Sequence, residues 1–220
     1  MPSCLSPPCA TATSSSQSKM PIRSIWRHAL QGELQLIIGP MFSGKSTELI
    51  RRMRRYQHAQ LKCMVVKSKI DDRYTNDSYV WLVSTHDRQM MKANPLTRLE
   101  DMGDEFMKYD VIGIDEGQFF TDLHSFCDDA ANRGKIVIVA ALDGTFERKP
   151  FQHVCDLIPR AESVTKLSAV CAICGSDAAF TRRLVSSTAV ELVGGSESYQ
   201  PVCRNCFTTP LVTGEEDEVN

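Results

Sequence analysis

The segment that most constrains this chain is Gly39–Ser46, which reads GPMFSGKS and fits the pattern G-x-x-x-x-G-K-[ST]. An apolar run, Leu34–Ile38, leads into it, and a helix-permissive stretch from Thr47 to Gln60 follows it. Glycines let the backbone wrap so that its N–H groups converge on phosphate oxygens, and the following helix directs its positive end at the same anions. The sequence therefore predicts a P-loop that binds the phosphates of a nucleoside triphosphate.

Two pairs of polar residues complete the predicted phosphate site. In the P-loop, Lys45 supplies a point charge to the β- and γ-phosphates, and the Ser46 hydroxyl is expected to ligate Mg²⁺. Such a site also needs a carboxylate at the end of a neighbouring strand, and Asp115 directly follows the apolar run Val111–Ile114. Asp115 can hold Mg²⁺, directly or through water, while Glu116 can take a proton from an attacking hydroxyl. The alternative, a solvated acidic turn, is disfavoured by the upstream P-loop.

Alternating strand and helix patterns predict an α/β fold, a P-loop NTPase-like and mostly parallel sheet flanked by helices. Further apolar runs indicate strands at Cys63–Val66, Val111–Ile114 and Ile136–Leu142. Between the last two, Phe119–Arg133 has room for one helix that Gly134 closes. From these changes in pattern we expect a P-loop α/β domain over 31–168 and a small zinc-ribbon-like module over 169–209. A disordered extension over 1–30 and an acidic disordered tail over 210–220 would flank them.

Four of the nine cysteines form two C-x-x-C pairs, Cys171 with Cys174 and Cys203 with Cys206, separated by 28 residues. Each pair can hold one side of a tetrahedral ion from a tight turn, and four thiolates leave no open coordination position. We therefore predict a structural zinc site, and favour it over a redox function. Two C-x-x-C pairs in a chain without a secretory leader pattern also favour a reducing compartment, hence a cytoplasmic protein.

The first 30 residues have two interpretations. They are rich in Pro, Ser and Thr and contain no Asp or Glu, which is typical of a disordered tail. The alternative is a targeting peptide, since the stretch is Ser-rich and carries Lys19, Arg23 and Arg27. A weak amphipathic pattern makes the tail the favoured interpretation.

Charge and hydropathy exclude two classes of partner. The net charge of −2 does not indicate a nucleic-acid binder, and the longest apolar runs are far too short to span a bilayer. A basic run follows the P-loop, and we interpret it as a solvated helix face in preference to a phosphate or RNA contact. That run consists of Arg51, Arg52, Arg54 and Arg55.

Four strings in order, GPMFSGKSTELIRR, IGIDEGQFF, VAALDGTFERKPF and KLSAVCAICG, closely resemble the type II (cytosolic-type) thymidine kinases. The resemblance covers about residues 32–207. It implies transfer of the γ-phosphoryl group of ATP to the 5′-hydroxyl of thymidine or deoxyuridine, with Glu116 as the general base. Similar enzymes are homotetramers that the end product, thymidine triphosphate (dTTP), inhibits.

The resemblance also implies the substrate contacts. ATP contacts carry over to Gly39, Pro40, Met41, Phe42, Ser43, Gly44, Lys45 and Ser46, to Asp71, Asp72 and Arg73, and to Asp115, Glu116, Gly117 and Gln118. Nucleoside contacts carry over to Met41, Phe119, Leu142 and Phe146 as pocket walls, with Val190, Glu191, Leu192, Val193, Gly194 and Tyr199 closing over the base. Arg73 is suited to neutralise charge on the transferring phosphoryl group.

Two features depart from the family pattern. The stretch Asn76–Val83 is longer than the usual connection and unusually apolar, so we expect an altered loop near the phosphates or a subunit contact there. The chain after Phe207 is short, so regulatory signals carried by longer tails are not expected.

Two other functions compete with a kinase. Asp115–Gln118 also resembles a helicase-type motif, in which the glutamate would activate water, but a motor needs a second lobe and further nucleic-acid motifs. A zinc-ribbon binding module with a P-loop switch is the other rival, and the base-like Glu116 argues against it.

Overall fold

The computed structural model describes residues 31–70, 82–84, 90–185 and 194–209. The strands are β1 Glu33–Ile38, β2 Cys63–Ser68, β3 Leu82–Ser84, β4 Met90–Lys92, β5 Asn94–Leu96, β6 Val111–Asp115, β7 Ile136–Ala141, β8 Ser163–Lys166, β9 Ala169–Val170, β10 Asp177–Ala178, β11 Phe180–Arg183 and β12 Tyr199–Val202. The α-helices are α2 Lys45–His58, α3 Leu123–Asn132, α4 Gln152–Cys155 and α5 Arg204–Thr208. The 3₁₀ segments are η1 Leu99–Lys108, η2 Gly117–Phe119 and η3 Ile158–Arg160.

Six strands form one sheet in the order β5-β2-β6-β7-β1-β8, and every neighbouring pair is parallel. All four strands that the sequence predicts lie in this sheet, so the predicted α/β class with a mostly parallel sheet is confirmed. The P-loop strand β1 lies between β7 and β8, and β6, which ends in Asp115, lies between β2 and β7. The carboxyl ends of all six strands therefore point to one edge of the sheet.

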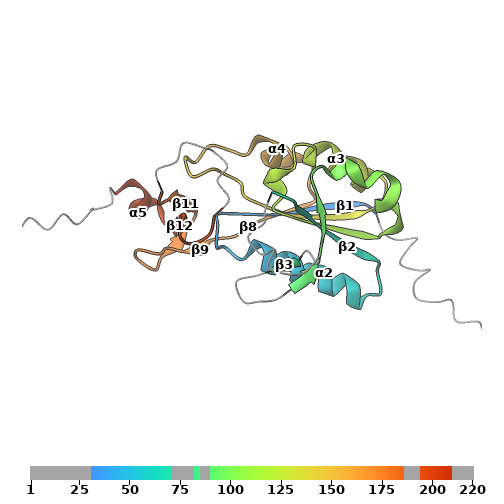
Figure 1. Ribbon diagram of the computed structural model, residues 1–220, viewed down its shortest axis with the longest axis horizontal. Helices are drawn as coiled ribbons and strands as arrows, with labels where there is room; N and C mark the ends of the chain where they lie inside the picture. The colour runs from blue at the N-terminus through green and yellow to red at the C-terminus, as the bar shows by residue number, and fades with distance from the viewer. Residues whose placement is uncertain (1–30, 71–81, 85–89, 186–193, 210–220) are drawn as a thin grey trace, which may run out of the picture.

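Helices cover both faces of the sheet (Figure 1), as a parallel sheet requires. On one face α2 buries Leu49, Ile50 and Met53 against alternate residues of the strands, among them Ile37 and Val65. Gly113 of β6 allows this close approach, because a Cβ there would lie 2.9 Å from the Met53 sulfur. On the other face η1, α3 and α4 pack over the remaining strand residues.

The helix after β6 begins later than the sequence predicts. Gly117–Phe119 is a separate 3₁₀ turn, and α3 starts at Leu123 instead of Phe119. The reason is local, since Phe120 has an extended backbone (φ −97°, ψ 110°) that interrupts the predicted helix, and Glu116 just before the turn is left-handed (φ 52°, ψ 45°). This turn changes the direction of the chain just after the strand end, where the predicted base lies.

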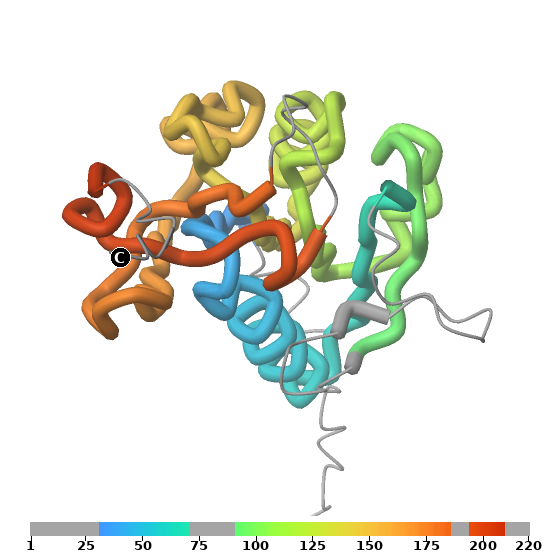
Figure 2. The backbone as a smooth tube through the Cα atoms, turned by 60° about the vertical axis from the view of Figure 1, so that its left-hand side comes forward, coloured from blue at the N-terminus to red at the C-terminus, as the bar shows by residue number. Residues whose placement is uncertain are grey.

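Residues 169–209 contain two small antiparallel hairpin pairings, β9 with β10 and β11 with β12, followed by α5. Their own core consists of Ala169, Cys171, Ala178 and Val202. Figures 1 and 2 show this region, called the zinc module after its four predicted ligands, at one end of the molecule beside the N-terminal end of α2.

Several elements were not predicted. β5 is only three residues long, and β8 reads SVTK at the edge of the sheet, with alternate half-buried and exposed residues instead of an apolar run. Of the unusual stretch Asn76–Val83, only Leu82 and Val83 are among the described residues, where they form part of β3. Among the described residues no helix is long and apolar enough to cross a membrane.

Candidate active site

The P-loop joins the end of β1 to the first turn of α2 through two left-handed residues, Phe42 (φ 63°) and Gly44 (φ 81°). Gly39 also has a positive φ, and a Cβ there would lie 2.5 Å from the carbonyl oxygen of Leu167. Glycine at position 39 is thus required by both conformation and space. The loop leads directly into Lys45, the first residue of α2.

Polar side chains of the P-loop are fixed by short hydrogen bonds. The Lys45 ammonium donates to the Pro40 carbonyl at 2.7 Å, and the Ser43 hydroxyl donates to the same carbonyl at 2.9 Å. The Ser46 hydroxyl donates to Asp115, at 2.9 Å from Oδ1 and 3.1 Å from Oδ2. The structure therefore brings the predicted pair Ser46 and Asp115 together, and a hydroxyl beside a carboxylate is an oxygen donor set that suits Mg²⁺.

Asp115 is 4% exposed, and a second buried charge lies beside it. Lys67, at 3% exposure, is its register partner on β2, so both side chains start from the same face of the sheet as α2. Sequence reasoning missed Lys67 because a single lysine at the end of an apolar strand belongs to no motif. Their register places charges of opposite sign at adjacent strand ends.

Gln118 connects Glu116 to the next strand end. Its Nε2 donates to Glu116 Oε2 at 2.6 Å, and its Oε1 accepts from the backbone N–H of Leu142 at 3.0 Å. Gln118 is 2% exposed, and its backbone carbonyl oxygen lies 2.8 Å from Nε2 of His153. A buried amide with both ends bonded leaves Glu116 little freedom, and it aligns the carboxylate with Leu142, one of the predicted nucleoside walls.

The predicted nucleoside walls come from both modules. Phe119 ends η2, while Leu142 and Phe146 lie in the loop after β7, all half-buried. Tyr199 begins β12 in the zinc module and is 6% exposed. Gly194 is buried, and a Cβ there would lie 2.6 Å from Ser198 Oγ. Two groups of predicted contacts, Asp71–Arg73 and Val190–Val193, lie outside the described residues.

One hydrogen bond joins the P-loop to the zinc module. The backbone N–H of Met41 donates to Thr181 Oγ1 at 3.0 Å, and Thr181 lies on β11 at 6% exposure. Sequence reasoning also missed Thr181, since one threonine in a short strand gives no signal. The contact places β11 beside the phosphate loop.

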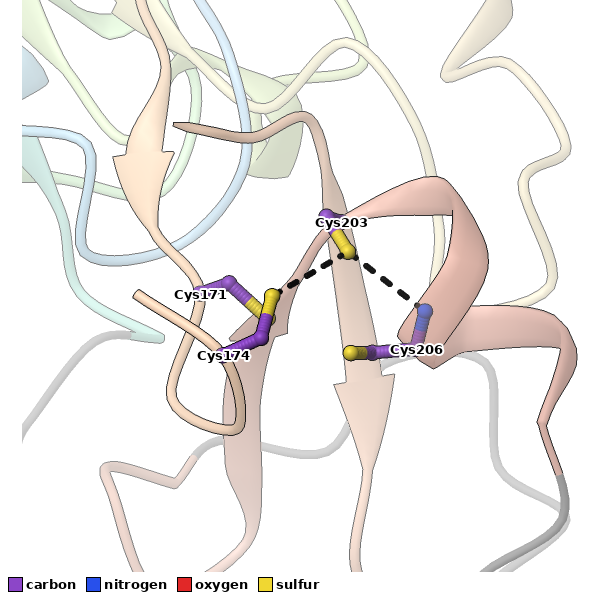
Figure 3. A group of neighbouring side chains, drawn as sticks. All are labelled: Cys171, Cys174, Cys203 and Cys206. Carbon is purple, nitrogen blue, oxygen red and sulfur yellow. Dashed lines mark hydrogen bonds between the residues drawn. The ribbon is translucent and has the colours of Figure 1, made fainter. Parts of the chain in front are cut away.

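The four predicted zinc ligands converge. Their sulfur atoms all lie within 4.8 Å of one another, with Cys174 Sγ 3.6 Å from Cys203 Sγ. Figure 3 shows Cys171 and Cys174 on one turn facing Cys203 and Cys206 at the start of α5. Four thiolates around one tetrahedral zinc ion stand about 3.8 Å apart, given a Zn–S distance of about 2.3 Å. The cluster can therefore hold a zinc ion.

The basic run on α2 lies mostly on the surface. Arg51, Arg54 and Arg55 are exposed, and both Arg51 and Arg52 donate to Glu48. These bonds, the one from Arg51 first, lower the pKa of Glu48 to about 2. Arg51, Arg54 and Arg55 agree with the interpretation of this run as a solvated helix face. Arg52 does not, because its side chain is 14% exposed and donates to Gln35 on β1 and Thr165 on β8.

A parallel sheet, a P-loop between β1 and α2 and a carboxylate at the end of β6 define a P-loop nucleotide-binding protein of the α/β class. Comparison with known proteins narrows the class. The thymidine kinase family (TK) matches residues 32–207. The chain therefore belongs to the thymidine kinase family, and the predicted resemblance to its type II members is confirmed.

Individual relatives agree with this assignment. The chain is 52% identical over 180 residues to thymidine kinase 1 of Dictyostelium discoideum, covering 82% of this chain and 79% of that protein. It is 54% identical over 176 residues to the thymidine kinase of Myxoma virus (strain Lausanne), covering 80% of this chain and 96% of that one. The thymidine kinase of Variola virus is 55% identical over 176 residues, covering 80% of this chain and 97% of that protein.

Proposed function

We propose that this chain transfers the γ-phosphoryl group of ATP to the 5′-hydroxyl of thymidine or deoxyuridine. The observation that carries the proposal is the position of Glu116. It follows Asp115, which bonds Ser46 of the P-loop, and it is held by Gln118, which also bonds the Leu142 N–H. A carboxylate between a phosphate loop and an apolar wall is where a base must stand to accept a proton from a nucleoside hydroxyl.

In the proposed reaction Glu116 takes the proton of the 5′-hydroxyl. The 5′-oxygen forms a bond to the γ-phosphorus, the bond from that phosphorus to the β,γ-bridging oxygen breaks, and ADP leaves with the bonding pair. The P-loop N–H groups and Lys45 stabilise the charge on the phosphoryl oxygens, as in other P-loop phosphotransferases. Arg73, outside the described residues, is proposed to assist them.

Two metal ions belong to the proposal. Ser46 and Asp115 would hold Mg²⁺, which neutralises phosphate charge when it is bound with ATP. Cys171, Cys174, Cys203 and Cys206 would hold a structural Zn²⁺ that fixes the two ends of the zinc module. The clustering of the four sulfur atoms supports the second assignment.

Regulation and assembly follow from family membership only. We propose a homotetramer with dTTP as feedback inhibitor, in the cytoplasm, where reduced thiols can keep zinc. Size-exclusion chromatography with light scattering, with and without ATP, measures the oligomeric state.

An assay of ATP consumption with and without thymidine tests the proposed function. A kinase consumes ATP only with thymidine and forms thymidine monophosphate in equal amount. Consumption stimulated by DNA or RNA would instead indicate a motor. No consumption under either condition would favour a binding module.

A further inference from the structure

Arg183, the last residue of β11, contacts two aromatic side chains that come from different parts of the chain. Its Nη2 donates to the hydroxyl of Tyr199, its register partner on β12, at 2.7 Å. Its guanidinium carbon lies 3.8 Å from the ring centroid of Phe146, which belongs to the loop after β7. One planar group therefore joins the zinc module to the P-loop domain.

These two contacts use different properties of the guanidinium group. Its flat face stacks on an aromatic ring, while its N–H groups donate in the plane of the group. An arginine can thus satisfy both partners at once, whereas a lysine can supply only the hydrogen bond with a point charge. Tyr199 is 6% exposed, so its hydroxyl needs a partner inside the protein, and Arg183 supplies it.

The position of Arg183 is fixed through Thr181, which lies two residues earlier on β11. Residues two apart on a strand share a face, so Arg183 starts from the same face as Thr181. Thr181 accepts the hydrogen bond from the Met41 N–H, which holds this face of β11 against the P-loop. A shift of β11 away from the P-loop would therefore also separate Arg183 from Phe146.

We propose that Arg183 is a positioning residue that sets the separation of Phe146 and Tyr199 and so controls affinity for the nucleoside. The inference rests on the proposed function, in which these two rings line the pocket for the pyrimidine base. Aromatic contacts with a flat base depend on ring spacing. Arg183 contacts both rings, since its guanidinium carbon lies 3.8 Å from the Phe146 centroid and 5.2 Å from the Tyr199 centroid. Because Arg183 acts on the rings and not on the P-loop, its loss should weaken nucleoside binding more than ATP binding.

The test compares steady-state KM and kcat for thymidine and for ATP, together with zinc content, in the wild type and in Arg183→Gln. We expect the KM for thymidine to rise about tenfold, in line with one lost stacking contact and one lost hydrogen bond. The KM for ATP and the zinc content should stay within about twofold. Arg183→Lys should fall between the wild type and Arg183→Gln, because it keeps a donor for Tyr199 but not the stack.

A double-mutant cycle separates positioning from a general loss of structure. Tyr199→Phe removes the acceptor hydroxyl and keeps the ring, so its effect on the KM for thymidine should overlap with that of Arg183→Gln. The double variant should raise the KM for thymidine by less than the product of the two single fold-changes. Arg133→Gln is the matched control, since Arg133, the residue after α3, lies 5.7 Å from the centroid of the Phe106 ring on η1, away from the site. It should leave both KM values unchanged.

If the wild type is active and Arg183→Gln leaves the KM for thymidine unchanged, this inference is overturned while the proposed function stands. Equal rises in both KM values with loss of zinc would also overturn it, because Arg183 would then stabilise the module as a whole. The inference would also be overturned if the effects of Arg183→Gln and Tyr199→Phe on the KM for thymidine multiplied fully in the double variant. A wild type that phosphorylates no thymidine would overturn the proposed function first, and this inference with it. Should Arg183→Gln not fold, Arg183→Lys carries the same comparison.

Discussion

The hydroxyl of Ser46 donates to the carboxylate of Asp115 at 2.9 Å, which joins the first turn of α2 to the end of β6. These residues are far apart in the sequence and meet because β6 and β1 are neighbours of the same strand, β7. The bond brings together the two side chains that are proposed to ligate Mg²⁺. It also means that each residue orients the other.

The first prediction concerns Asp115→Asn, which keeps the size of the side chain but removes its charge. We expect the Mg²⁺ concentration for half-maximal activity to rise about 10–100-fold and kcat/KM to fall with it. Titration of activity with Mg²⁺ at fixed ATP measures the change. Asp129→Asn is the control, an exposed carboxylate on α3 paired with Arg133. Normal Mg²⁺ dependence in Asp115→Asn would contradict the assigned role.

The second prediction concerns Glu116→Gln. Gln118 can still bond the new amide, so the turn should keep its shape while the base is lost. We expect kcat to fall by about 10²–10⁴, with little change in the binding of ATP or thymidine. Single-turnover kinetics measure the rate of phosphoryl transfer, and calorimetric titration measures the binding of ATP and of thymidine. Glu105→Gln, an exposed residue on η1, should behave as wild type. Near-normal turnover in Glu116→Gln would eliminate Glu116 as the base.

The parts of the molecule that could be predicted from sequence are those with a local pattern. The strands β1, β6 and β7 are mostly apolar, β7 without interruption, because a parallel sheet buries both of their faces. The edge strand β8 is half exposed and has no such run, so it could not be found. Local pattern therefore sufficed for the centre of the sheet and failed at its edge.

The same distinction applies to the site. The P-loop and Asp115–Gln118 are motifs within short segments, and they could be recognised without a structure. Lys67 and Thr181 take their positions from strand register and from contact between modules. Such relationships depend on how distant segments pack, and no short window of sequence contains them.

The third prediction concerns loss of the zinc ligand in Cys203→Ser. We expect zinc to be lost and thymidine binding to fall below detection, because Tyr199 and Gly194 lie between the cysteine pairs. Structural zinc is worth about 10–16 kcal/mol in small peptides, far more than this module can replace from its small core. ATP affinity should change less, since the module touches the P-loop through the Met41–Thr181 bond while α2 packs on the sheet.

Metal analysis and calorimetric titration of ATP and thymidine measure these effects. Cys63→Ser is the control, a half-buried thiol on β2 outside the cluster, whose pKa is raised to about 11 by burial. It should keep its zinc and both affinities. Thymidine binding that survives complete loss of zinc would show that the ion does not maintain the nucleoside pocket.

The fourth prediction concerns the pH dependence of stability from Glu48, whose side chain is 20% exposed and bonded to Arg51 and Arg52. The bond from Arg51, with help from Arg52, lowers the pKa of Glu48 from 4.5 to about 2 in the folded protein. A carboxylate with a lowered folded pKa stabilises the fold fully above its unfolded pKa. Its contribution then declines as the pH falls from about 4.5 towards 2.

Glu48→Gln should therefore lower the free energy of unfolding by about 1 kcal/mol at pH 7, the upper range for partly exposed ion pairs. The difference from the wild type should shrink steadily between pH 4.5 and the lowest pH at which both proteins fold. Urea unfolding at pH 7, 5, 4 and 3 measures it, and high salt should reduce the difference at pH 7. Glu105→Gln, which removes an exposed pair with Lys108, is the control and should show a smaller difference at every pH. A constant difference from pH 7 to pH 3 would show that Glu48 stabilises α2 by packing or neutral hydrogen bonds instead of by its charge.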